Sequence, residues 1–77
     1  MPRMITVRPV NEGWALLNGD SDPLVFETSA QAVWSARKLG ETLAEGGVDS
    51  EIQVMQRDGG LAGRFICPAA LARLELA

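Results

Sequence analysis

Oxygen-bearing side chains recur at every second position of "NGDSD", the spacing of a calcium-binding loop. Asn18, Asp20 and Asp22 stand at the first, third and fifth positions of such a loop. Pro23 then occupies the place of the turn glycine, and Ser29 occupies the place of the bidentate glutamate. Because the pattern fails at both positions, we expect an ordinary polar turn here and no metal.

Two further segments contain residue types that are used in nucleophilic or phosphate chemistry. Cys67 is the only cysteine and the chain has no histidine, so no imidazole can activate the thiol and no zinc set can form. The run "RDGGLAGR" lacks the Lys-Ser/Thr ending of a phosphate-binding loop and is flanked by strand-like runs. We therefore expect a buried, unreactive thiol and a hairpin turn. The chain is predicted to have no catalytic residues and no cofactor, and not to be an enzyme.

Three arginines could contact phosphate groups from one face of a sheet. Alternation in the strand-like runs places Arg8, Arg57 and Arg64 on the face opposite the aliphatic residues. Such a face can follow a nucleic-acid backbone, but a solvated face is also usual for an antiparallel sheet. The net charge of −3 argues against dominant binding to phosphates. We therefore keep a nucleic-acid-binding module as an alternative function and not as the leading one.

The elements that would position these residues follow from hydrophobic periodicity and turn residues. Period-two alternation or short apolar runs predict strands in "MITVRPV", "WALLN", "LVFE", "SEIQVMQR" and "GRFIC", with turns at "NEG", "GDSDP" and Asp58-Gly59. Thr28 and Gln31 have the spacing of a capping box, and helical spacing continues from there to Gly46-Gly47. Pro68 can begin a short helix over "AALARLEL".

This order of elements predicts a small α+β domain. One main helix would pack on one face of an antiparallel sheet of three to five strands, in the order β-β-β-α-β-β, with a further short helix at the C-terminal end. Residues 1–77 form a single domain, with a core over about 4–67 and a tail over 68–77. A chain of 77 residues buries only about 60% of its unfolded surface. With neither a disulfide nor a metal available, association is the remaining source of burial.

The two tryptophans are predicted to differ in burial. Helical spacing gathers one apolar face for the sheet, made of Ala32, Val33, Ala36, Leu39, Gly40 and Leu43. Trp34 points away from that face in a sector shared with Lys38, whereas Trp14 is expected in the core. Trp34, Lys38, Leu71 and Leu74 form the candidate partner surface. Four environments are compatible with Trp34. The tail, a second copy or another protein could cover it, or it could be exposed beside Lys38.

Composition limits where and how the chain acts. An apolar fraction of 47% is that of a globular domain, and no apolar run approaches the roughly 18 residues of a membrane span. The start "MPRMITVRPV" lacks the apolar stretch of a signal peptide, so we expect a cytoplasmic location and no membrane partner. The leading function is a non-enzymatic module acting by self-association or protein contact. We expect a homodimer with Trp34 or the tail at its interface.

Three stretches of the chain resemble a known family. These are "GWAL", "FETSAQAVWSARKLGETLAEGG" and "IQVMQRDGGLAGRF", and together they resemble the small bacterial domain-of-unknown-function family 2188 over about residues 4–66. That family has a Gly-Trp-Ala strand, a helix after an F-x-T-like step and a late Arg-Asp-Gly turn. Here Gly60 and Gly63 loosen the segment after the turn, and "PAALARLELA" replaces a Lys-rich tail. The resemblance implies no reaction, because the family has no agreed function.

Overall fold

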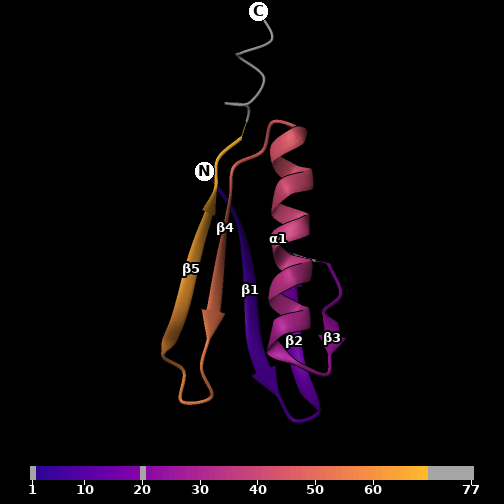
Figure 1. Ribbon diagram of the computed structural model, residues 1–77, viewed down its shortest axis with the longest axis vertical. Coiled ribbons are helices and arrows are strands. Elements are labelled where there is room, and N and C mark those ends of the chain that lie inside the picture. The colour runs from indigo at the N-terminus through magenta and orange to yellow at the C-terminus, as the bar shows by residue number, and fades with distance from the viewer. Residues whose placement is uncertain (1, 20, 70–77) are drawn as a thin grey trace, which may run out of the picture.

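A five-stranded sheet with one helix across one of its faces forms the described part of the chain (Figure 1). This computed structural model describes residues 2–19 and 21–69. The elements are β1 (Arg3–Val10), β2 (Gly13–Asn18), β3 (Leu24–Phe26), α1 (Ser29–Glu45), β4 (Ser50–Met55) and β5 (Leu61–Cys67). The expected α+β class, with one main helix on one face of the sheet, is confirmed. The sheet was expected to be antiparallel throughout and is instead mixed.

The strand order is β3-β2-β1-β4-β5, which makes β1 the central strand. Three of the four neighbouring pairs are antiparallel, and the fourth, β1 with β4, is parallel. The parallel pair arises because α1 carries the chain from the β3 edge back across the sheet. The next strand therefore enters beside β1 and runs in the same direction. The result is a mixed sheet in which, among the described residues, β3 and β5 have no strand on their outer sides.

Local sequence signals set both ends of α1. The Gln31 backbone N–H donates to Thr28 Oγ1 over 3.1 Å, and the Thr28 N–H donates to Gln31 Oε1 over 3.3 Å. This is the predicted capping box. At the other end the Val48 N–H donates to the Leu43 carbonyl over 2.8 Å, and Gly47 has a φ of 87°. A left-handed residue after the helix is the expected role of the Gly46-Gly47 pair.

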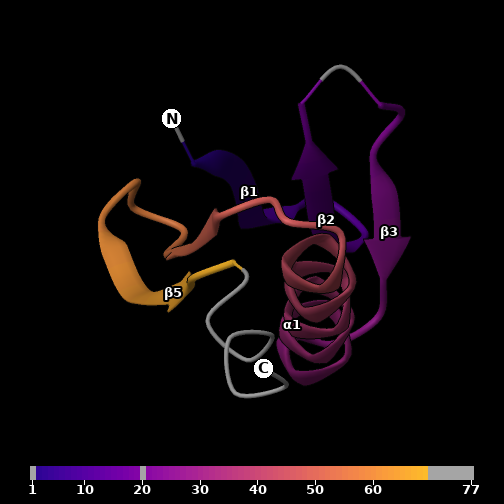
Figure 2. The same ribbon diagram turned by 90° about the horizontal axis from the view of Figure 1, so that it is seen from above.

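The core lies between α1 and the covered face of the sheet. Its fully or almost fully buried members are Ile5, Val7, Leu16, Ala32, Ala36 and Ile52. Trp14 is partly buried and packs against this cluster. Small residues let the helix approach closely, since a Cβ added at Gly40 would lie 2.8 Å from Cys67 Sγ. Seen from above, β3 and β5 stand to either side of the helix (Figure 2).

The predicted helix after Pro68 and the leucines Leu71 and Leu74 lie outside the described residues. The description ends at Ala69, whose backbone N–H donates to Asp49 Oδ1 over 2.7 Å. Over residues 2–19 and 21–69, no helix is long and apolar enough to cross a membrane.

Candidate functional site

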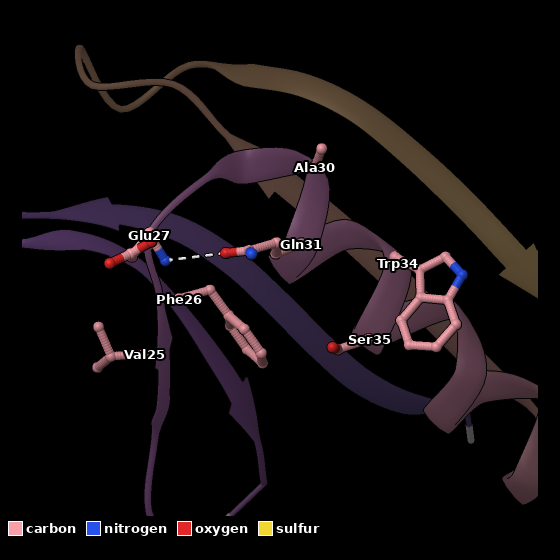
Figure 3. Close-up of a pocket in the computed structure, with 7 residues that line it drawn as sticks. All are labelled: Val25, Phe26, Glu27, Ala30, Gln31, Trp34 and Ser35. Carbon is pink, nitrogen blue, oxygen red and sulfur yellow. Dashed lines mark hydrogen bonds between the residues drawn. The ribbon is translucent and has the colours of Figure 1, made fainter.

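An open groove runs between the edge strand β3 and the N-terminal half of α1 (Figure 3). Its volume is about 620 Å³. The residues that line it come from a short stretch of sequence: Val25, Phe26, Glu27, Ala30, Gln31, Trp34 and Ser35. Four of the seven are apolar and only Glu27 is charged. The groove is therefore a largely apolar surface with one negative group at the β3 end.

The chain holds the groove in shape at the corner where β3 leads into α1. Phe26 lies opposite Trp14 in the β2–β3 register, which turns its ring toward the helix side of the sheet. The Glu27 backbone N–H donates to Gln31 Oε1 over 3.2 Å, so the capping side chain also fixes this corner (Figure 3). Gly13 lets β3 approach β2 closely, because a Cβ at that position would overlap the Phe26 carbonyl oxygen.

Trp34 is the most exposed large hydrophobic side chain in the described part of the chain, at 64%. Its predicted position on the outward side of the helix is confirmed. Lys38 Nζ lies 5.7 Å from the centre of the indole, as in a cation–π pair, and 3.5 Å from Glu41 Oε1. Both Lys38 and Glu41 have largely exposed side chains, so Lys38 contacts the indole without covering it from solvent. The other two members of the predicted partner surface, Leu71 and Leu74, fall outside the described residues.

The second free edge, β5, also carries exposed apolar side chains. Leu61, Phe65 and Ile66 are 51%, 36% and 59% exposed. Arg37 of α1 lies over the Phe65 ring at 5.2 Å from its centre. The sequence predicted "GRFIC" as a strand, but no local signal distinguished Phe65 and Ile66 as exposed.

The three arginines are only partly brought together. Arg8 and Arg57 line one hollow of about 250 Å³, together with Pro9, Met55, Gln56 and Gly59. Arg64 instead forms an ion pair with Glu51, with 2.8 Å between Nε and Oε2. Gln53 Nε2 donates to the same carboxylate oxygen over 3.1 Å. Alternation along β4 places positions 51 and 53 on the same side, so an acidic residue shares the face of the arginines.

The remaining candidates from the sequence show ordinary structural roles. The Ser21 N–H donates to the Asn18 carbonyl over 3.1 Å, which closes a turn, while Asp20 lies outside the described residues. Cys67 was expected to be buried and is only partly so. No group of three His, Cys, Asp or Glu side chains that could hold a metal occurs over residues 2–19 and 21–69.

Comparisons with models of known protein families, with curated proteins and with solved structures found no match. What the chain binds therefore has to be inferred from its own surface, where two apolar areas border the two free edges of the sheet.

Proposed function

We propose that this protein is a non-enzymatic interaction module that binds an extended segment of another polypeptide in the groove between β3 and α1. The observation that carries this proposal is Trp34, which is 64% exposed on the helix wall of an open, mostly apolar groove. Tryptophan is enriched among the residues that dominate binding energy at protein interfaces. Leaving so large an apolar side chain in water is costly unless a partner covers it.

The strand wall of the groove favours an extended partner. Over residues 2–19 and 21–69, β3 pairs with β2 alone, so its outer side presents backbone N–H and C=O groups without a strand beside them. A polypeptide that lies along this edge can add to the sheet through its own backbone, with alternate side chains directed into the groove. Because the groove is open, it cannot enclose most of the surface of a small ligand, and it suits an elongated partner better.

The lining also defines the partner's side chains. Phe26 on the strand wall and Trp34 on the helix wall favour aliphatic or aromatic residues at the alternate positions of the bound segment that face the groove. Glu27 is the only charged residue of the lining, and it favours a lysine or arginine in the part of the bound segment that lies at the β3 end of the groove. The proposed partner is thus an extended apolar segment with a basic residue at one end.

Selection from a displayed library of random peptides tests this function. We expect the enriched peptides to carry apolar residues at alternate positions and a basic residue at one end. Trp34→Ala should weaken their binding by about 30-fold, the loss that corresponds to a hot spot of about 2 kcal/mol. Ile66→Lys, on the opposite edge of the sheet, is the control and should leave affinity unchanged. Enriched peptides that bind Trp34→Ala as well as wild type would overturn the proposal.

One observation favours the alternative function of nucleic-acid binding. Arg8 and Arg57 line the same hollow, so both can reach one phosphate backbone. The ion pair of Arg64 and the net charge of −3 count against it. Two phosphate contacts would give a slope of about −2 for log affinity against log salt. No binding to single- or double-stranded DNA at low salt would rule this alternative out.

We also propose a cytoplasmic location for the protein. The resemblance to the domain-of-unknown-function family 2188 remains a further proposal, and it assigns no reaction.

A further inference from the structure

Over Gly63 to Cys67, beyond the irregular end of its ladder with β4, the edge strand β5 lacks the features that normally keep a sheet edge from pairing. It has seven residues, against three in β3, and within the described chain it pairs only with β4. No proline interrupts it, and its single charged residue, Arg64, is already paired with Glu51. Prolines, inward-pointing charges and short length are the usual guards of such edges.

Exposed apolar side chains lie on both faces of this edge. Phe65 stands opposite Ile52 in the β4–β5 register and so points to the α1 side, where Arg37 lies over its ring. Ile66 stands opposite Glu51 and points to the other side, with 59% of its surface exposed. Figure 2 shows β5 standing to one side of α1. A strand added beside β5 would cover apolar surface on both faces at once.

We infer that β5 pairs antiparallel with β5 of a second copy, so that two sheets join into one. In a twofold dimer the β5 edges of both copies pair with each other, so neither is left exposed. If β5 paired with another strand of the second copy, the β5 edge of that copy would stay unpaired. The Arg64–Glu51 pair makes the edge locally neutral despite the net charge of −3. On the face opposite α1, two copies therefore meet with the charge of Arg64 already paired. This interface differs from the one expected at Trp34 or the tail.

The structure also fixes the register of this pairing. The ladder between β4 and β5 is irregular near Met55 and Leu61, so the regular part of β5 is Gly63 to Cys67, with Phe65 at its centre. A twofold axis through Phe65 places the two phenyl rings opposite each other. Gly63 then faces Cys67 of the second copy. An axis through Arg64 would place two guanidinium groups opposite each other, which is unfavourable.

Cross-linking tests both the pairing and the register. A side chain added at Gly63 meets nothing within 4 Å, so Gly63→Cys should fold normally. Under oxidation with copper phenanthroline, the introduced thiol should form a disulfide with Cys67 of the second copy, because opposite residues in a ladder lie within disulfide range. Positions 63 and 67 of one strand are about 13 Å apart, too far for a bond within one copy. The covalent dimer should disappear when Cys67 is also replaced by serine. A cross-link that persists without Cys67 would overturn the register.

Solution mass tests the association itself. Sedimentation at concentrations up to about 100 µM should give twice the chain mass of 8.3 kDa. Ile66→Lys should weaken the dimer at least tenfold, because the new ammonium group would face Arg64 of the second copy. Within its own copy that group can pair with the neighbouring Glu51, so the fold should persist. Wild type that remains monomeric throughout would overturn the inference.

Val25→Lys is the matched control, since Val25 is also 59% exposed but lies on the other edge strand. It should leave the dimer intact, as should Trp34→Ala, which tests peptide binding in the groove. Equal effects of Val25→Lys and Ile66→Lys on the dimer would contradict pairing through β5. A failure of peptide binding in the groove can therefore be distinguished from a failure of dimerisation through β5.

Discussion

Replacing Gly13 with alanine should push β3 away from β2, because the added Cβ has no room at that position. The Cβ would overlap the Phe26 carbonyl oxygen, which is a backbone atom and cannot rotate out of the way. Gly13 also has a φ of 148°, a conformation that residues with a side chain rarely adopt. The substitution therefore combines a steric overlap with backbone strain.

The two effects can be given magnitudes. Backbone strain in this region costs about 1–3 kcal/mol, and forcing extra atoms into a packed site costs about 1–3 kcal/mol. A three-residue strand can detach instead of unfolding the whole domain, which limits the total. We expect a loss of about 3 kcal/mol in the free energy of unfolding, a large part of the 5–15 kcal/mol typical of domains. Detachment of β3 would also remove one wall of the groove.

Urea unfolding followed by tryptophan fluorescence measures this loss, and two other glycines separate its causes. Gly59 has a φ of 91° but open space around it, so Gly59→Ala should cost only the strain, about 1–2 kcal/mol. Gly63 has neither constraint, so Gly63→Ala should change stability by less than about 1 kcal/mol. If Gly13→Ala costs no more than Gly59→Ala, the close approach of β3 does not limit stability and the reasoning fails.

Two further predictions concern the core. Trp14→Ala should cost about 3 kcal/mol, because Trp14 packs against the buried cluster, whereas Trp34→Ala should cost less than about 1 kcal/mol; equal losses in urea unfolding would show that the two tryptophans are misassigned. Ser50 is fully buried and its hydroxyl has no hydrogen-bond partner among the described residues. Ser50→Ala should therefore raise stability by about 1 kcal/mol and the Tm by about 4–8 °C, and a lower Tm in calorimetry would mean that the hydroxyl is satisfied.

Sequence analysis succeeded where the signals are local. The capping box of Thr28 and Gln31 and the glycine pair after the helix involve neighbours along the chain, so they define α1 without knowledge of the fold. The outward position of Trp34 follows from helical periodicity for the same reason. Alternation also places the aliphatic residues of "MITVRPV" on one face, and Ile5 and Val7 on that face are completely buried.

The parallel pair and the groove could not be predicted in this way. Placing β4 beside β1 depends on which strand lies next to the returning helix, and no nearby residue records that choice. The groove likewise needs β3 to be the edge strand that borders the flank of α1 bearing Trp34. Alternation alone places Glu51 and Gln53 on one face, but the contact of Glu51 with Arg64 also depends on the register between β4 and β5.

The parallel pairing of β1 with β4 has a consequence for how the chain folds. β1 begins at Arg3 and β4 ends at Met55, so most of the chain must be present before the central strand has both neighbours. The chain loses the entropy of closing this long loop before the contacts between β1 and β4 stabilise it. Folding is therefore expected to be slower than that of an all-helical domain of this size. During synthesis β1 stays an open edge until β4 emerges. The strand that ends as the best protected in the sheet is thus, for a time, the one most open to pairing with another chain.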